Sequence, residues 1–148
     1  LTTESGQSIR FSHTDVREMG RTATGVIGMK LDKSDVIVAS DKIPEGAKGT
    51  ELLVVTANGY GKKTKLSEYK IQHRGGSGIK TVKVTAKTGK LIVARVVTEE
   101  NEELLAVSKE SQVIRTEIKS IPTLGRDTQG VRIMKLREKD SVASFNLL

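Results

Sequence analysis

The stretch Gly78-Ile79-Lys80-Thr81-Val82-Lys83 decides the fold, because the chain contains it three times in related form. Its counterparts are Gly25-Val26-Ile27-Gly28-Met29-Lys30 and Gly130-Val131-Arg132-Ile133-Met134-Lys135, which lie 53 residues before it and 52 residues after it. Each copy begins with a glycine and an aliphatic residue and ends with an apolar residue and a lysine. Self-similarity at a fixed period of this size is typical of repeat architectures.

The register extends outward from this stretch over most of each unit. An arginine stands four residues before each leading glycine. Three further positions align upstream: one holds a hydroxyl residue, one holds glycine or serine, and one holds a basic residue. We place the repeat units at about residues 1–50, 51–103 and 104–148. The aligned sets are Arg21, Arg74 and Arg126; Thr3, Thr56 and Ser108; Gly6, Gly59 and Ser111; and Arg10, Lys63 and Arg115.

The local signals within each unit indicate strands. Short β-branched runs at 51–56, 79–84 and 91–97 are separated by turn residues such as Ala57-Asn58-Gly59. In the run 79–84, Val82 is expected to point inward and Lys83 outward, as in a half-buried strand. About four strands per unit predict an all-β, propeller-like array whose units need their neighbours to bury a core. The lack of tryptophan argues against a WD40 propeller.

Composition favours an anionic partner. The 148 residues include 25 Lys plus Arg and 18 Asp plus Glu, for a net charge of +7. Such a balance indicates nucleic acid ahead of an acidic membrane surface or an acidic protein. The lack of cysteine rules out disulfides and thiolate metal sites and favours a reducing compartment, the cytoplasm. No apolar run approaches a membrane span, and the absence of an initial Met suggests an excerpt of a longer chain.

Positive charge is concentrated in the same part of every unit. Residues 6–31, 59–84 and 111–136 together carry a net charge of +11, so the rest of the chain carries −4. If the units are arranged around an axis, these segments form one continuous basic rim that suits a polymer of phosphates. Duplex DNA is favoured over single strands, because single-strand binders stack bases on exposed aromatic side chains and this chain has few aromatics.

Each candidate motif for catalysis or metal binding lacks a residue that it needs. Gly75 to Thr81 resembles a phosphate-binding P-loop, but Ile79 separates the last glycine from the lysine and a strand is expected to follow. His13 and His73 have no cysteine nearby and are expected to be surface side chains. Tyr69 lacks the acidic cluster that a metal-assisted cleavage would need. We therefore predict no catalytic residue and no metal site in this chain.

Three passages resemble one known family, the C-terminal domain of the A subunit of DNA gyrase, which is a bacterial type II topoisomerase. They are Gly59 to Thr64 with Glu68-Tyr69, Gln72 to Lys80, and Gly125 to Arg132, and the similarity covers nearly the whole chain. The family's diagnostic box reads Gln-basic-Arg-Gly-Gly-basic-Gly. The box-like segment here is Gln72-His73-Arg74-Gly75-Gly76-Ser77-Gly78, in which His73 and Ser77 replace basic residues.

The resemblance implies a β-pinwheel, of which this chain holds about three blades. It further implies non-specific DNA wrapping on the basic rim in support of ATP-dependent negative supercoiling. The chain would not be catalytic by itself; ATP and magnesium would act elsewhere in an A2B2 holoenzyme with the B subunit, in the cytoplasm at the nucleoid. The alternatives are a scaffold that binds an acidic protein and the DNA-bending domain of the topoisomerase IV A-type subunit.

The residues expected to contact DNA are basic, and most of them recur at equivalent positions of the repeat. The guanidinium fork of the aligned arginines suits phosphate, although an arginine beside an aligned glycine can instead cap a turn carbonyl. The predicted DNA contacts are Arg10, Arg21, Lys30, Lys62, Lys63, Lys65, Lys70, His73, Arg74, Lys80, Lys83, Arg115, Arg126, Arg132 and Lys135.

The sequence also predicts self-association at high concentration, because the strands at the open edges of the blades can pair with other chains.

Overall fold

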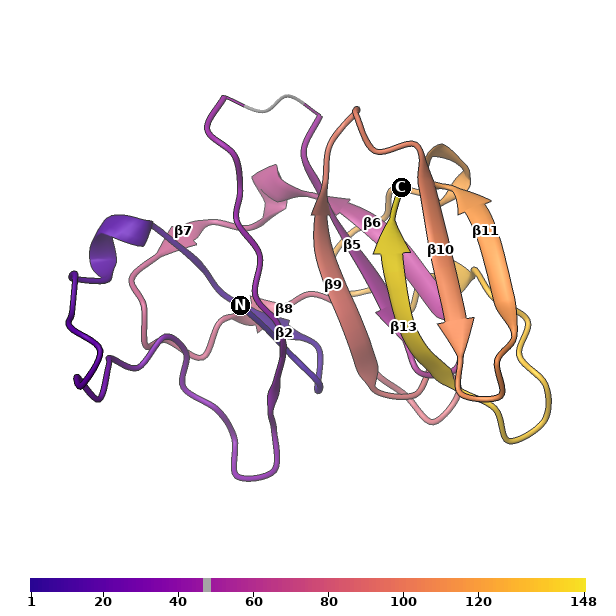
Figure 1. The fold of residues 1–148 in the computed structure, drawn as a ribbon, viewed down its shortest axis with the longest axis horizontal. Helices are drawn as coiled ribbons and strands as arrows, with labels where there is room; N and C mark the ends of the chain where they lie inside the picture. Colours follow the sequence, from indigo (N-terminus) through magenta and orange to yellow (C-terminus); the bar gives the residue numbers. More distant parts are fainter. Residues whose placement is uncertain (47–48) are drawn as a thin grey trace.

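Short strands joined by turns make up the fold, which a computed structural model describes for residues 1–46 and 49–148 (Figure 1). Three 3-10 turns are the only helical elements among these residues. The strands are β1 (Thr2–Thr3), β2 (Gln7–Ser8), β3 (Arg10–Phe11), β4 (Ile37–Ala39), β5 (Glu51–Thr56), β6 (Tyr60–Lys65), β7 (Ile71–Gln72), β8 (Ile79–Lys80), β9 (Leu91–Val97), β10 (Glu103–Ser108), β11 (Val113–Glu117), β12 (Val131–Arg132) and β13 (Val142–Leu147), and the 3-10 turns are η1 (His13–Asp15), η2 (Leu66–Glu68) and η3 (Ile118–Ser120).

Neighbouring repeats are joined by an exchanged strand, which belongs to one repeat and completes the sheet of the preceding repeat. The first sheet has the order β4-β1-β2-β8 and the second β12-β6-β5-β9, so each takes three strands from its own repeat and one from the next. In the second sheet Val131 pairs with Gly61 and Arg132 with Tyr60. The third sheet, β11-β10-β13, consists of strands of its own repeat. The predicted all-β, propeller-like fold is confirmed, and the exchange explains how a unit of this size buries its core.

Strand β5 is buried on both faces because it lies between two cores. Leu53 and Val55 belong to the core shared with the third sheet, whereas Leu52 and Val54 belong to the core shared with the first. All four side chains are at most 7% exposed. A strand covered on both sides reads as a continuous apolar run, which accounts for the sequence Leu-Leu-Val-Val at positions 52–55.

The repeat is visible in the backbone as well as in the sequence. Thr3, Thr56 and Ser108 are all buried, and each side-chain oxygen makes a hydrogen bond to the backbone four residues later in the same hairpin turn. The aligned Gly6, Gly59 and Ser111 all have positive φ angles, of 89°, 78° and 60°. Ser111 therefore adopts the left-handed conformation that glycine takes in the other two repeats.

The expected strand at 79–84 is shorter in the structure, where only Ile79–Lys80 forms β8. The carbonyl of Gly6 accepts hydrogen bonds from the amides of both Thr81 and Val82, so the regular ladder ends there. The inward and outward alternation still holds, since Val82 is fully buried and Lys83 is exposed. The expected strands at 51–56 and 91–97 are confirmed at the same bounds.

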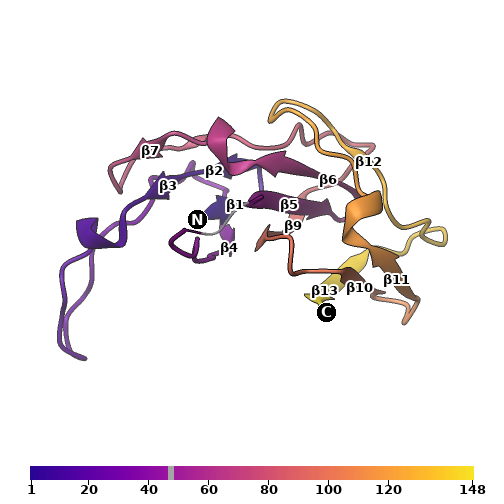
Figure 2. The same ribbon diagram turned by 90° about the horizontal axis from the view of Figure 1, so that it is seen from above.

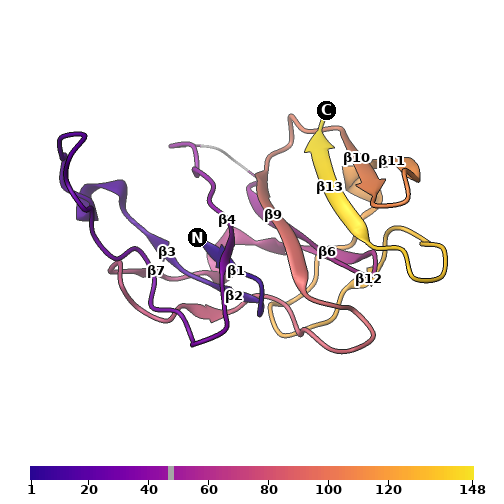
Figure 3. The ribbon, with the colours of Figure 1, turned by 60° about the horizontal axis from the view of Figure 1, so that its bottom comes forward.

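The molecule is an arch with a convex and a concave edge. In Figure 2 the strands β7, β6 and β12 follow the convex edge, and β4, β9 and β13 lie toward the concave side. Strand β9 contacts β4 on one side and β13 on the other, as Figure 3 also shows. The most basic segment, residues 59–84, contains β6, β7 and β8 and hence follows the convex edge, whereas acidic Glu99 and Glu100 lie in the turn after β9.

The glycines that lead the repeated stretch give a matched pair for testing the strand exchange. Gly25 and Gly130 have φ angles of 91° and 79°, so alanine is strained at both positions. A Cβ on Gly130 would lie 2.5 Å from the Gly61 carbonyl oxygen, whereas a Cβ on Gly25 meets no described atom within 4 Å. We expect Gly25→Ala to lower the free energy of unfolding by about 1 kcal/mol and Gly130→Ala by about 1–3 kcal/mol more.

Urea unfolding of the two variants measures the difference. Equal losses would show that the close contact between β12 and β6 does not contribute to stability.

Candidate nucleic-acid interface

The aligned arginines join one repeat to the preceding one. Arg74 donates from Nη1 to the carbonyl of Ile27 at 3.1 Å, and Arg126 donates from Nη1 to the carbonyl of Lys80 at 3.0 Å. Ile27 and Lys80 occupy equivalent positions, 53 residues apart. The capping role considered for these arginines therefore describes Arg74 and Arg126. Arg21, at the third equivalent position, is exposed.

The second aligned trio is also engaged within the protein. Arg10 donates to the carbonyl oxygens of Leu66 at 3.0 Å and Tyr69 at 3.3 Å, and so caps η2. Lys63 forms an ion pair of 3.1 Å with Glu51, and Arg115 forms one with Glu103. The two carboxylates are themselves 52 residues apart. The pairing with Glu103 raises the pKa of the Arg115 guanidinium.

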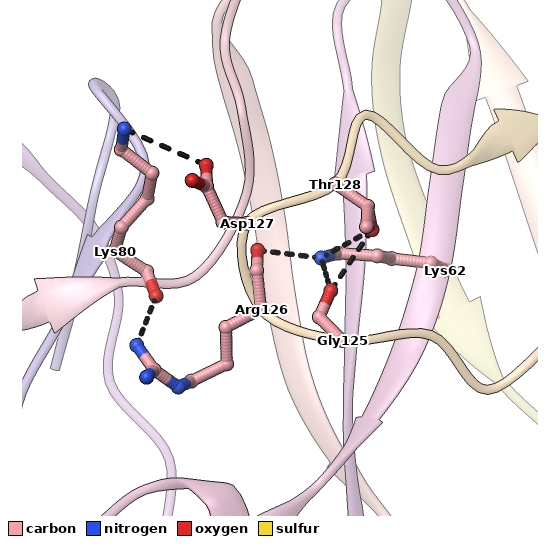
Figure 4. Close-up of polar contacts among 6 residues, drawn as sticks. All are labelled: Lys62, Lys80, Gly125, Arg126, Asp127 and Thr128. Carbon is pink, nitrogen blue, oxygen red and sulfur yellow. Dashed lines mark hydrogen bonds and ion pairs between the residues drawn. The ribbon is translucent and has the colours of Figure 1, made fainter.

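The prediction that Lys62 contacts DNA is at odds with the structure, in which its side chain is fully buried. Its ammonium donates to the carbonyl oxygens of Gly125 at 2.5 Å and Arg126 at 2.7 Å and to the hydroxyl of Thr128 at 2.9 Å (Figure 4). All three N–H donors of the ammonium thus have acceptors inside the protein. Lys62 is therefore not available to a phosphate at the surface.

Burial lowers the pKa of Lys62 to about 8 from the usual 10.5. The ammonium loses its hydration, and its three acceptors are neutral, so only part of the cost is offset. The carboxylates of Glu68 and Asp127 act in the opposite direction, and the guanidinium of Arg126 adds to the lowering.

Three further predicted contacts have polar partners. Lys80 lies 3.5 Å from Asp127, and exposed His73 lies 3.5 Å from Asp15. Arg132 is exposed, donates to the Tyr60 hydroxyl at 3.1 Å, and lies over the Tyr60 ring. Such exposed pairs are weak and exchange readily with solvent, so Lys80 and Arg132 remain accessible to an external anion.

The remaining predicted contacts are exposed cations that are free of side-chain partners within the described part of the chain. They come from all three repeats. They are Arg21, Lys30, Lys65, Lys70, Lys83 and Lys135.

The box-like segment lies against the first repeat. The amide of Gly75 donates to the carbonyl of Gly28 at 2.7 Å, and the carbonyl of Gly76 accepts from the amide of Lys30 at 3.0 Å. A Cβ on Gly78 would lie 2.5 Å from the Ser8 carbonyl oxygen. The glycines of the segment therefore permit a close approach of two backbones.

Other candidate groups have structural partners. The Tyr69 hydroxyl is hydrogen bonded to Thr81 in the core, and burial raises its pKa. Within residues 1–46 and 49–148 no three histidine or acidic side chains are grouped so as to hold a metal ion. The same residues include no helix long and apolar enough to cross a membrane.

Sequence reasoning missed the role of Lys62, although the repeat alignment contained a signal. The equivalent positions hold Ile9 and Ile114. A lysine at a position that is otherwise isoleucine indicates a buried ammonium. The identity of its acceptors depends on the exchanged strand, which places residues 125–128 over β6.

The pKa of Lys62 predicts how stability varies with pH. Between pH 8 and 10.5 the unfolded chain holds the Lys62 proton and the folded chain has released it, so the free energy of unfolding rises with pH in this window. Below pH 8 the folded state bears the full cost of burying the charge. We expect unfolding between about pH 7 and about pH 9.5 to show this rise in the unmodified chain, at most about 1.4 kcal/mol per unit of pKa difference.

Lys62→Met should lose this contribution to the pH dependence. Thermal and urea unfolding of both proteins across the range measure it. Identical pH profiles would contradict the lowered pKa.

Comparison with known proteins identifies the family. The family model described as "DNA gyrase C-terminal domain, beta-propeller" matches residues 1–44, 50–98 and 102–148. The DNA gyrase A subunit of Deinococcus deserti is 41% identical over 147 residues, which are 97% of this chain and 18% of the relative. Its counterpart from Mycobacterium tuberculosis is 42% identical over 98% of this chain and 17% of its own length. The chain thus spans less than a fifth of these relatives.

Solved structures agree. A structure of the DNA gyrase A C-terminal domain matches with a TM-score of 0.84 at 31% identity, over 99% of this chain and 48% of the other. The C-terminal domain of DNA topoisomerase IV matches with a TM-score of 0.90 at 24% identity, over 99% of this chain and 45% of the other, which shows a shared fold. The chain therefore belongs to the family of the DNA gyrase C-terminal domain, a beta-propeller.

Proposed function

We propose that this chain binds duplex DNA through its phosphates along the convex edge, without reading base sequence. The observation that carries the proposal is the set of exposed cations that lack side-chain partners within the described part of the chain. Lysines without an internal partner lose no ion pair when a phosphate arrives. Each phosphate that they neutralise releases condensed counterions, which supplies the free energy of binding.

The aromatic side chains support duplex over single-stranded DNA. Tyr60, Tyr69 and Phe145 are at most 7% exposed, and Phe11 is half-buried. Single-strand binding relies on aromatic platforms for stacked bases. An exposed platform of that kind is lacking in the described residues.

Family membership supports a more specific role. Within the gyrase holoenzyme, we infer that this domain wraps a DNA segment around its convex edge and thereby supports ATP-dependent negative supercoiling. The B subunit of gyrase and the rest of the A subunit would be its protein partners, with ATP and magnesium bound elsewhere in an A2B2 assembly in the cytoplasm. Curved duplex held at intervals by basic side chains, without base contacts, needs no sequence specificity.

Charge reversal on the convex edge tests the interface. We expect Lys65→Glu, Lys70→Glu and Lys83→Glu, combined in one variant, to abolish measurable binding of a mixed-sequence duplex, because three phosphate contacts are lost and three negative charges are introduced. Replacing the same lysines by Met should lower the slope of log affinity against log salt by about 0.9 per lost contact. Fluorescence anisotropy at several salt concentrations measures both effects.

A matched control reverses Lys33, Lys42 and Lys109, which are also exposed. Lys33 precedes β4, Lys42 follows it, and Lys109 lies in the turn after β10. This control carries the same net charge and should retain most of the affinity. Equal losses in the two variants would mean that net charge alone drives binding, and a strong preference for one short sequence would contradict a phosphate interface.

A further inference from the structure

We infer that Lys62 is a positioning residue for the proposed DNA interface: its buried ammonium fixes the loop Gly125–Thr128 and, through it, the exposed cations Lys80 and Lys83 as one phosphate-binding unit. The inference rests on the proposed function, which supplies the phosphate. It assigns a role to a side chain that itself cannot reach the surface.

The first step is the attachment of the loop to β6. Besides the three hydrogen bonds of the Lys62 ammonium, the hydroxyl of Thr64 donates to the carbonyl of Leu124 at 2.8 Å. Thr128 closes the loop on itself, since its hydroxyl donates to the carbonyl of Gly125 at 2.9 Å. The carbonyls of Gly125 and Arg126 are therefore held toward the ammonium and away from the surface.

The second step leads from the loop to the exposed lysines. Arg126 donates to the carbonyl of Lys80 at 3.0 Å, and the carboxylate of Asp127 lies 3.5 Å from the Lys80 ammonium (Figure 4). The carbonyl of Thr128 accepts from the amide of Lys83 at 3.0 Å. Both lysines are thus connected to the loop that Lys62 holds.

The other junction between repeats shows what Lys62 adds. There Arg74 and the carbonyl of Gly76 make the equivalent contacts to Ile27 and Lys30. The side chain under that loop is Ile9, which is 3% exposed, and its Cδ1 lies 3.4 Å from a Cβ built on Gly76. The second junction therefore carries a buried positive charge and Lys80, where the first has Ile9 and exposed Ile27.

This arrangement makes the second junction sensitive to pH. The charged groups that face Lys62 are Glu68 on η2 and Asp127 and Arg126 on the loop. When the ammonium loses its proton, the interface loses a positive charge. The loop itself stays closed, because opening it would hydrate Lys62 and require the amine to bind a proton again between pH 8 and 10.5. DNA affinity should then fall above pH 8, while the stability of the fold rises in the same range. A purely structural lysine would not separate the two quantities.

The test measures duplex affinity and amide hydrogen exchange in the whole 148-residue chain. Lys62→Met removes the ammonium, and the control Lys65→Met removes one exposed cation from the same strand. Losing one phosphate contact lowers affinity about five- to tenfold at 0.1 M salt, and Lys65→Met should show this loss near pH 7. Lys62→Met should also bind more weakly near pH 7, because the interface loses a positive charge and the loop that carries Lys80 and Lys83 is no longer held. We expect the unmodified chain and Lys65→Met to lose affinity between about pH 7 and about pH 9.5, and Lys62→Met to show no such change.

Hydrogen exchange without DNA gives an independent readout. The hydrogen-bonded amides of Leu124, Arg126 and Lys83 should exchange faster in Lys62→Met than in Lys65→Met. In the unmodified chain, opening of the loop hydrates Lys62 and restores its ordinary pKa, so exchange corrected for its intrinsic pH dependence should slow between pH 8 and 10.5, which provides a test even if Lys62→Met does not fold. Unchanged exchange in these amides would overturn the inference.

The two proposals fail separately. If the unmodified chain binds no duplex at any salt concentration, the proposed function falls, and the exchange data still decide whether Lys62 holds the loop. If the duplex binds and Lys62→Met keeps the full pH dependence, the positioning role is overturned and the proposed function stands.

Discussion

The structure depends on the close approach of two backbones where one repeat lends a strand to the preceding one. Gly78 lies against Ser8 and Gly130 against Gly61, so closely that a methyl group would overlap a carbonyl oxygen at either position. The sheets β4-β1-β2-β8 and β12-β6-β5-β9 acquire their fourth strand through these contacts. The same contacts bring the loops that follow Arg74 and Arg126 over the preceding repeat, and hence create the convex edge.

The exchanged strands also explain why some basic residues bond to a neighbouring repeat while others are exposed. Arg74, Arg126 and Arg10 donate to main-chain carbonyls across repeats, and Lys63 neutralises a glutamate. The three arginines join neighbouring repeats, and Lys63 pairs within its own repeat. Exposed Lys30, Lys65, Lys70, Lys83 and Lys135 have no side-chain partner within the described residues. Arginine therefore supplies most of the junctions between repeats, and we propose that lysine supplies most of the DNA-binding surface.

The repeat architecture and most of the longer strands could be predicted from the sequence, because the period of 52–53 residues and the alternation within each strand are visible in the sequence itself. The positive φ angles of Gly6 and Gly59 follow from the turns in which they lie, and the strands 51–56 and 91–97 follow from their apolar runs. The roles of individual basic residues could not be predicted. Alignment shows that Arg21, Arg74 and Arg126 are equivalent, but which of them meets a carbonyl depends on a neighbouring repeat being present in space. Lys62 and Lys63 are adjacent in sequence, yet strand alternation buries the first fully and leaves the second only half-buried.

The central claim is that exposed lysines on the convex edge face the DNA. Its most direct test is the acetylation rate of each lysine, measured by mass spectrometry with and without a saturating mixed-sequence duplex. The account predicts that Lys65, Lys70 and Lys83 become protected by DNA, that Lys33, Lys42 and Lys109 keep their reactivity, and that buried Lys62 reacts slowly in both states. Protection spread evenly over all exposed lysines, or confined to Lys33, Lys42 and Lys109, would contradict the account.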